Sequence, residues 1–233
     1  MINYKNIDIL SSKEIFLKNR RLVIDNFLDE EFANKLLKYY SEEMPKNLWC
    51  ATYMPSLRFN GDWEWWKNIK ENRYNKDIGY AYASLARENN MFAYYFYKTI
   101  NEQMGDYSNT VHQETMDLFS GKEIKDLLNE ITQLNLTGES VFVSRYSERC
   151  FLTRHSDDPN GQLAFVFHLT KNWNPDWGGL YLDLRNVNDI RAICPTFNKM
   201  VIFEVTNESS PHAVTQVVDN INKERISVTG WYK

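Results

Sequence analysis

The stretch LTRHSDDPNGQLAFVFHLT, residues 152–170, combines a candidate ligand pair with a candidate β-strand. His155 and Asp157 stand two positions apart, just before the turn-forming residues 159–161. The residues that follow are rich in aromatic and apolar side chains, as strands are. On an extended chain, residues i and i+2 point to the same side. His155 and Asp157 could therefore bind one ion, provided that a third ligand comes from elsewhere.

The rest of the chain after residue 138 has the same character. Short runs rich in β-branched and aromatic residues alternate with turn signals, among them Gly178-Gly179, which we expect to permit a tight hairpin. This pattern predicts an antiparallel sandwich or barrel. The runs are SVFVSRY (140–146), QLAFVFHLT (162–170), GGLYLDL (178–184), KMVIFEV (199–205) and RISVTGWYK (225–233).

The part of the chain before these strands is mainly helical in pattern. A short strand is predicted over residues 20–28, followed by a helix that begins after Asp29. A second helix is predicted over roughly 79–105. A third is predicted to begin at Ser120, which forms a capping-box pattern with Glu123.

Length and composition favour a single α+β domain with a mainly β core. We assign the domain to residues 1–233, with a mainly helical part (1–138) and a β core (139–233) on which the helices pack. Hydrophobic residues make up 43% of the chain, which is enough for a sizeable core. The formal net charge of −4 and the lack of a long basic run argue against nucleic-acid binding.

Cysteine usage and the N-terminus predict a cytoplasmic protein. Cys50, Cys150 and Cys194 are odd in number and scattered, which matches neither a disulfide framework nor a zinc pattern. The first residues do not resemble a signal peptide, and no apolar window reaches the length of a membrane span. We therefore expect no membrane association.

The third ligand must come from the few remaining histidines. The sequence contains four, His112, His155, His168 and His212, and His212 follows an apolar strand and a polar turn. A neighbouring strand could bring it beside the pair. Two imidazoles and one carboxylate can occupy one face of an octahedral iron(II) and leave three positions for a co-substrate and dioxygen. Asp158 would point to the other side of the strand, so we do not expect it to be a ligand.

A candidate partner for the co-substrate begins the last predicted strand. Arg225 stands there, with Ser227 on the same face. An inward arginine beside a metal site needs an anionic partner, because an unpaired buried charge is costly. The guanidinium fork suits a carboxylate. The dicarboxylate 2-oxoglutarate fits, since its keto acid end can chelate iron while its other carboxylate meets Arg225.

With these features in order, the sequence resembles the iron(II)/2-oxoglutarate-dependent dioxygenases, most closely their prolyl hydroxylase-like branch. The resemblance covers roughly residues 141–232. It implies a double-stranded β-helix (jelly-roll) core, with oxidative decarboxylation of 2-oxoglutarate to succinate and CO2 coupled to oxidation of a C–H bond. The segments that carry it are RYSERCFLTRHSDDPNG, FHLTKNWNPDWGGLYLDL, CPTFNKMVIFEV, SPHAVTQV and RISVTGWY.

The same resemblance implies roles for individual residues and a set of cofactors. Arg225 would bind the distal carboxylate of 2-oxoglutarate, with Tyr146 and Ser227 in the same pocket. His168 departs from the pattern, because prolyl hydroxylases usually carry at this place a tyrosine that hydrogen-bonds to the distal carboxylate. The expected cofactors are iron(II), 2-oxoglutarate and dioxygen, with ascorbate as an optional addition. The implied metal ligands and catalytic residues are His155, Asp157 and His212.

The leading interpretation is a hydroxylase acting on an amino-acid residue, either free or within a peptide or protein. A halogenase would lack the carboxylate ligand, and Asp157 is present. Two non-hydroxylase alternatives stay open at this point. One is a non-catalytic module that senses iron, oxygen or 2-oxoglutarate, and the other is a cupin-like protein that binds zinc or manganese.

Several other residues are candidates for substrate contact, each with a structural alternative. The tryptophans at 63, 65 and 66 could form a substrate lid or pack in the core. We expect His112 to be a surface or capping residue. Arg145 and Arg154 lie near the motif in sequence, but each could be a solvated strand residue.

Overall fold

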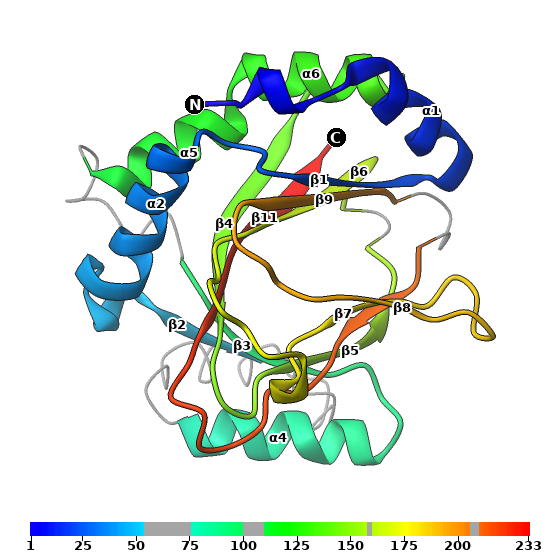
Figure 1. The fold of residues 1–233 in the computed structure, drawn as a ribbon. Helices are drawn as coiled ribbons and strands as arrows, with labels where there is room; N and C mark the ends of the chain where they lie inside the picture. Colours follow the sequence, from blue (N-terminus) through cyan, green and yellow to red (C-terminus); the bar gives the residue numbers. More distant parts are fainter. Residues whose placement is uncertain (54–75, 100–109, 158–159, 206–209) are drawn as a thin grey trace.

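A computed structural model describes residues 1–53, 76–99, 110–157, 160–205 and 210–233 (Figure 1). One curled sheet dominates the described part of the chain, and its strands run antiparallel to their neighbours in the order β1-β9-β6-β11-β4-β3-β5-β10-β7-β8, with β2 paired to β3. The strands are β1 (Arg21–Asp25), β2 (Cys50–Tyr53), β3 (Tyr94–Lys98), β4 (Glu139–Tyr146), β5 (Phe151–His155), β6 (Leu163–His168), β7 (Tyr181–Asp183), β8 (Arg191–Ile193), β9 (Lys199–Glu204), β10 (His212–Val214) and β11 (Arg225–Tyr232).

Helices cover the outside of this curl (Figure 1). α1, α5 and α6 lie over the part of the sheet that contains β1, β9, β6 and β11, whereas α4 lies beside β2 and β3. The predicted α+β jelly roll with helices packed on it is therefore confirmed. The helices are α1 (Ile9–Asn19), α2 (Glu30–Lys38), α4 (Lys76–Glu88), α5 (Val111–Ser120) and α6 (Lys122–Thr132), with short turns η1 (Tyr4–Asn6), η2 (Tyr39–Glu43), η3 (Lys46–Leu48) and η6 (Pro175–Trp177).

The helix predicted over roughly 79–105 is wrong over Tyr94–Lys98, and residues 100–105 lie outside the described residues. α4 ends at Glu88, and Asn90 has a positive φ of 57°, a conformation that commonly ends helices. The residues Tyr94–Lys98 instead form β3, which pairs with β2, β4 and β5. Pairing on both sides of a strand outweighs local helix propensity, which is only a weak preference.

The capping box predicted at Ser120 is also wrong. Ser120 is the last residue of α5, and α6 begins at Lys122 with Gly121 as its N-cap and no side-chain cap bond. A Cβ at Gly121 would lie 2.7 Å from the backbone oxygen of Asp117. The two helices therefore need a glycine where they meet, and the hydroxyl of Ser120 belongs to the end of one helix rather than the start of the next.

An ion pair joins strands from opposite ends of the sheet order. Arg21 on β1 and Asp183 on β7 are both buried, and Arg21 Nη1 lies 2.6 Å from Asp183 Oδ2. Arg185 Nη2 also contacts Asp183, at 2.7 Å. These contacts join β1 to β7, two strands that are far apart in the sheet order, and so link the two sides of the curled sheet.

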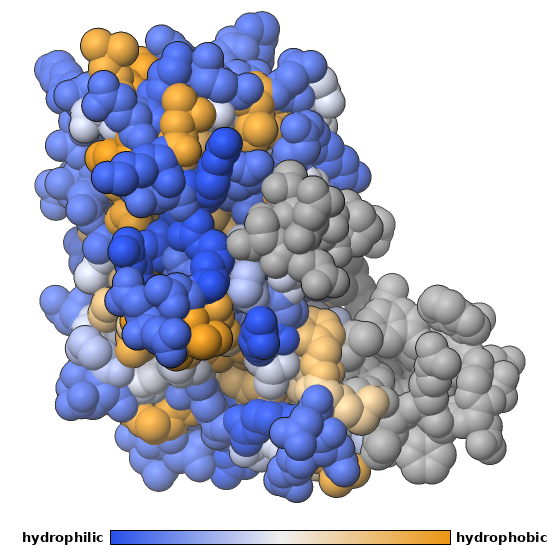
Figure 2. All heavy atoms as spheres, turned by 90° about the vertical axis from the view of Figure 1, so that its right-hand side faces the viewer, coloured by the Kyte–Doolittle hydropathy of each residue, from blue (hydrophilic) through white to orange (hydrophobic). Residues whose placement is uncertain are grey.

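The face shown in Figure 2 is mostly polar where the chain is described. Figure 2 views the side on which β1 and β9 lie above β7 and β8 in Figure 1, and apolar side chains there form separate patches among polar ones. Among the described residues, no helix combines the length and the apolar character that crossing a bilayer requires.

Candidate active site

Two neighbouring strands bring the candidate metal ligands together. β5 ends at His155 and β10 begins at His212, and these two residues are direct partners in the antiparallel register. Their ring centroids lie 4.1 Å apart. Asp157 follows β5, with its carboxylate oxygens 3.2 Å from His155 Nε2 and 3.5 Å from His212 Nε2. One ligand atom from each of the three residues lies within 4.8 Å of the others, so this group could hold a metal ion.

Both imidazoles are oriented by backbone carbonyls. His155 Nδ1 lies 3.0 Å from the carbonyl oxygen of Thr153, and His212 Nδ1 lies 2.9 Å from that of Ser210. A carbonyl only accepts, so each Nδ1 carries the proton and donates it. Each Nε2 then presents a lone pair toward Asp157. This is the tautomer that a metal-binding histidine needs.

The charge state of the group also suits a divalent cation. Burial alone would raise the pKa of Asp157, but His155 and His212 outweigh it, and the pKa lies below its ordinary value. Burial, reinforced by the neighbouring His155, lowers the pKa of His212 to about 4. At neutral pH Asp157 is therefore an anion and His212 a neutral ligand.

The ligand group opens into a cavity of about 510 Å³ inside the curled sheet. Two sets of strands contribute much of its wall, and β2, β6, β7, β9 and β10 contribute the rest of the strand residues that line it. One set, β4 and β11, contributes residues that include Tyr146, Arg225 and Trp231, and the other set, β3 and β5, contributes Tyr94 and His155.

Arg225 is a buried cation on this cavity wall. It is 3% exposed, pairs with Tyr146 in the β11–β4 register, and places its guanidinium 4.7 Å from the centre of the Tyr146 ring. Its Nε and Nη1 have no hydrogen-bond partner within the described ranges of the chain. Buried N–H groups are almost always paired in proteins. Burial lowers the pKa of Arg225 from its very high ordinary value, and a guanidinium remains protonated in proteins. The wall therefore holds unused donors and a positive charge that an anion would complete.

His168 and Ser227 lie behind this wall. They are partners in the β11–β6 register, and His168 Nδ1 lies 3.0 Å from Ser227 Oγ. The cavity lining includes Arg225 but neither of these two residues. Burial, and after it the charge of Arg225, keep the pKa of His168 well below its ordinary value, so the ring is neutral. Its Nε2 is buried and has no partner among the described residues. The predicted carboxylate contact of His168 stays a prediction.

Gly178 and Gly179 allow a close approach behind Arg225. Both have positive φ, 72° and 64°, as a tight turn requires, although the turn joins η6 to β7 rather than closing a hairpin. A Cβ at Gly178 would lie 1.9 Å from the carbonyl oxygen of Gln216, and one at Gly179 would lie 3.1 Å from the Trp173 ring and 3.2 Å from Val217. The glycine pair thus lets this turn pack closely against Trp173 and the segment 216–217, next to Arg225.

The remaining sequence candidates lie away from the cavity or outside the described residues. His112 is 4% exposed and its Nδ1 lies 3.0 Å from the hydroxyl oxygen of Tyr40, so the expectation of a surface or capping residue is wrong: α5 packs against α2 and buries that face. Arg154 is exposed and absent from the cavity lining. The tryptophans at 63, 65 and 66, and Asp158, lie outside the described residues.

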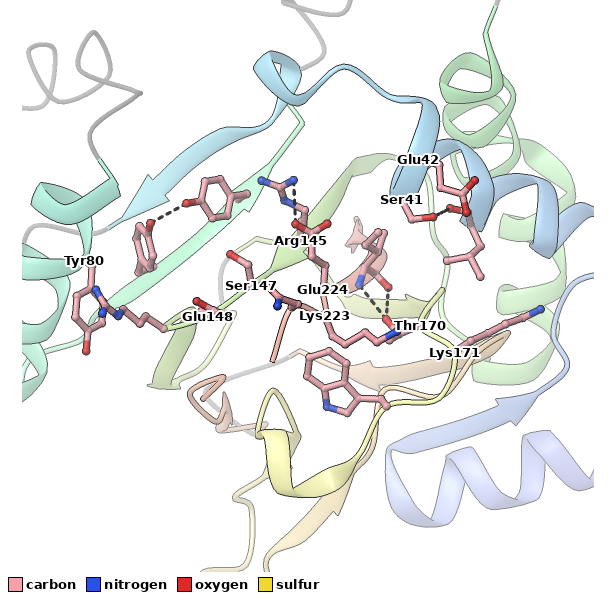
Figure 3. A pocket seen from close by; sticks show the side chains of 17 residues that line it. Ser41, Glu42, Tyr80, Arg145, Ser147, Glu148, Thr170, Lys171, Lys223 and Glu224 are labelled. Carbon is pink, nitrogen blue, oxygen red and sulfur yellow. Dashed lines mark hydrogen bonds and ion pairs between the residues drawn. The ribbon is translucent and has the colours of Figure 1, made fainter. Parts of the chain in front are cut away.

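Arg145 belongs to a second, larger pocket of about 780 Å³ on the opposite side of β3 and β4 (Figure 3). Figure 3 shows Arg145 pointing toward Glu224, and their Nη1 and Oε1 atoms lie 3.3 Å apart. The guanidinium also lies between Trp49 and Tyr97, 4.9 and 4.7 Å from their ring centres. Since these contacts occupy Arg145 internally, it is not available to a substrate in the catalytic cavity.

Sequence analysis missed the contribution of β3 to the cavity. Phe92, Tyr94 and Phe96 line it, yet they fall within the segment interpreted as helix. The sequence did contain a signal for this strand. Asn89 and Asn90 indicate a break in the helix, and aromatic residues follow at every second position, 92, 94 and 96, as on one face of a strand.

Comparison with known proteins agrees with this geometry. Residues 141–233 match the model of the 2OG-Fe(II) oxygenase superfamily. A comparison with curated proteins found no match.

Solved structures share the fold across nearly the whole chain. A Pseudomonas putida prolyl-4-hydroxylase has a TM-score of 0.63 and 14% identity, over 97% of this chain and 98% of that one. A Trichoplax adhaerens prolyl hydroxylase, solved in complex with a hypoxia inducible factor peptide fragment, has a TM-score of 0.61 and 18% identity, over 96% and 91%. A Burkholderia pseudomallei oxidoreductase of the 2OG-Fe(II) oxygenase family has a TM-score of 0.58 and 11% identity, over 100% and 93%.

Proposed function

We propose that this chain, whose residues 141–233 match the 2OG-Fe(II) oxygenase superfamily, is an enzyme of this kind that hydroxylates a C–H bond of an amino-acid residue, either within a peptide or free. The overall reaction consumes the C–H substrate, 2-oxoglutarate and dioxygen, and yields the alcohol, succinate and CO2. The observation that carries the proposal is the presence, in one cavity, of a candidate metal group and a buried arginine with unused donors.

We assign the metal to His155, Asp157 and His212. The set contains two neutral nitrogen donors and one carboxylate, which is the donor set that suits iron(II) with open coordination positions. When bound, iron(II) provides the site at which 2-oxoglutarate and dioxygen react and the C–H bond is oxidised. The protein contributes the orientation of the ligands: the carbonyls of Thr153 and Ser210 hold both rings with Nε2 toward the ion.

We assign the distal carboxylate of 2-oxoglutarate to Arg225. Its Nε and Nη1 are the donors that a carboxylate would satisfy, and Tyr146 holds the guanidinium from one face. Ser227 and His168 form a hydrogen-bonded pair behind it. If the Ser227 hydroxyl donates to His168 Nδ1, the ring carries its proton on Nε2 and can donate it to the same carboxylate. Arg225 and His168 thereby set the depth at which the co-substrate binds.

We favour a peptide as the substrate. The Trichoplax prolyl hydroxylase of similar fold was solved with a peptide bound. We also propose that residues 1–138 and 139–233 act as one domain, because β1, β2 and β3 from the first part belong to the same sheet as the strands that carry the ligands.

The test combines reconstitution with a substrate screen. The protein is loaded with iron(II) and supplied with 2-oxoglutarate and dioxygen, with and without ascorbate, and succinate is measured alongside the mass of each candidate amino acid or peptide. We expect about one succinate per hydroxylation and a mass gain of about 16 Da in the substrate, as the reaction stoichiometry requires. A protein that binds zinc, ignores 2-oxoglutarate and forms no succinate would refute the proposal.

A further inference from the structure

Strand β3 presents different residues to the two pockets of the molecule. Tyr94, Phe96 and Lys98 line the catalytic cavity, whereas Tyr95 and Tyr97 line the second pocket on the other side. Side chains alternate across a strand, so this division follows from the period of two. β3 is therefore a shared wall, and its catalytic side is aromatic.

The aromatic residues on the catalytic side form a continuous row, defined here as Phe92, Tyr94 and Phe96. The ring centroids of Phe92 and Tyr94 lie 5.7 Å apart, and those of Tyr94 and Phe96 lie 5.5 Å apart. At one end, the Phe92 ring lies 5.2 Å from the His155 ring. At the other end, the Phe96 ring stacks on Tyr146 at 5.2 Å with an interplanar angle of 2°. The aromatic row thus runs from a candidate metal ligand to the tyrosine beneath Arg225.

The aromatic row is anchored by β3 and left partly exposed. Tyr94 pairs with Leu152 of β5 and Phe96 pairs with Thr52 of β2, so neighbouring strands fix the backbone of these two residues, and Phe92 directly precedes the strand. Phe92 is nevertheless 38% exposed, and Tyr94 and Phe96 are half-buried. An exposed aromatic surface beside a reactive centre favours binding of an apolar group, because covering the surface removes apolar area from water.

We propose that the aromatic row selects the substrate by binding an uncharged, apolar side chain of the residue to be hydroxylated, and that it disfavours an ionised one. This inference rests on the proposed function. The Phe92 ring lies 5.2 Å from the His155 ring, so a substrate side chain packed on Phe92 has its carbon atoms close to the candidate metal ligands. An ionised side chain placed on the same rings would lose hydration without gaining a hydrogen bond from them.

The charged residues of the cavity do not provide an alternative site on the row. Asp157 belongs to the metal group, and Arg225 stands with Tyr146 at the far end. Lys98 lies over the ring of Phe142, with its Nζ 5.4 Å from the ring centroid. Between His155 and Tyr146, the row itself offers aromatic faces and the hydroxyl of Tyr94.

The test uses blocked pentapeptides of the sequence Ac-Ala-Ala-X-Ala-Ala-NH2, with X as Pro, Leu, Lys or Asp. Two quantities are measured. One is peptide-stimulated succinate release by the iron-loaded protein, and the other is peptide binding to the nickel-loaded protein by calorimetry, which needs no turnover. We expect the Pro and Leu peptides to bind at least about tenfold more tightly than the Lys and Asp peptides, which corresponds to about 1.4 kcal/mol.

Variants of the row separate its role from that of the metal site. Phe92→Ala should weaken binding of the preferred peptide to the nickel-loaded protein about tenfold, and Phe92→Leu should weaken it less. Phe92→Lys should shift the preference toward the Asp peptide, because the row then carries a cation. The matched control is Tyr95→Phe, which changes the other face of β3 and should leave peptide preference unchanged.

The outcomes distinguish the inference from the proposed function. Equal binding of all four peptides, or an unchanged preference in Phe92→Ala and Phe92→Lys, overturns the inference even if succinate forms. Failure of every peptide to bind also overturns it. Selective binding that depends on Phe92, without succinate from any peptide or amino acid, supports the selecting role of the row and refutes the hydroxylase function.

Discussion

Two walls of the cavity offer different chemistry to a ligand. The wall from β4 and β11 places a buried cation, Arg225, against Tyr146, with donors that nothing in the described structure satisfies. The wall from β3 places aromatic rings that remain partly exposed. The first wall suits one small dianion with fixed geometry, because a charge-assisted bond depends strongly on position. The second suits a range of apolar groups, because burial of apolar area has little directional preference.

This difference predicts where substitutions will matter. Changes in the Arg225 wall should alter the requirement for 2-oxoglutarate in large steps, since each removes or misplaces a buried charge. Changes in the β3 wall should alter substrate preference in smaller steps. The candidate metal group on β5 and β10 lies beyond the β3 wall in the sheet order, next to Phe92, and its loss should abolish turnover whatever either wall binds.

The largest effect is expected for the metal ligands. Replacing His155 or His212 with Ala, or Asp157 with Gly, should abolish turnover, because each removes one of only three protein ligands. In wild type, manganese(II) should raise the melting temperature by binding the folded state, and this increase should vanish in the variants while their metal-free melting temperatures stay close to wild type. Normal rates in both histidine variants would show that the metal lies elsewhere.

Substitution of Arg225 should have the next largest effect, confined to 2-oxoglutarate. The planar fork is lost in Arg225→Lys, and a charge-assisted bond of this kind is worth roughly 1.5–3 kcal/mol. The affinity for 2-oxoglutarate should fall about ten- to a hundredfold, and further in Arg225→Ala, with manganese binding nearly intact. Titration of 2-oxoglutarate against metal-loaded protein measures this. Equal affinity in wild type and Arg225→Ala would remove Arg225 from the site.

The same arginine should lower the stability of the ligand-free protein. Its Nε and Nη1 are buried and have no partner among the described residues, so we expect the folded state to bear a desolvation cost that 2-oxoglutarate would offset. Arg225→Met, with similar volume and no charge, should raise the free energy of unfolding without 2-oxoglutarate by about 1 kcal/mol. Urea denaturation measures it, and 2-oxoglutarate should then stabilise wild type but not the variant. A clear loss of stability in Arg225→Met would mean that the guanidinium already has adequate partners.

The smallest effect is expected at His168. It lies behind the cavity wall and is neutral, so it can offer one uncharged hydrogen bond. His168→Phe should raise the 2-oxoglutarate requirement by roughly fivefold, since a neutral hydrogen bond contributes about 1 kcal/mol. His168→Tyr should be tolerated, because a phenol can donate to the same carboxylate. A loss of 2-oxoglutarate affinity in His168→Phe as large as that in Arg225→Lys would show that the guanidinium does not dominate recognition of the carboxylate.

The sequence by itself determined the β core and indicated the candidate ligand group. The strands after residue 138 are short, β-rich and separated by turn residues, so their pattern is local and survives in the fold. His155 and Asp157 are close along the chain, and His212 begins a strand that a curled antiparallel sheet can place beside them. Arg225 was found because a strand of known phase fixes which side chains face inward.

Tertiary structure decided what depended on contacts between distant residues. Tyr94–Lys98 became a strand because β2, β4 and β5 pair with it, and these partners come from separate parts of the chain. His112 became buried because α5 packs on α2, and Arg21 meets Asp183 only because the sheet curls. Local propensities are worth tenths of a kcal/mol per residue, whereas pairing and burial on two sides are worth several times more. The aromatic wall of the cavity could therefore be recognised only in the folded chain.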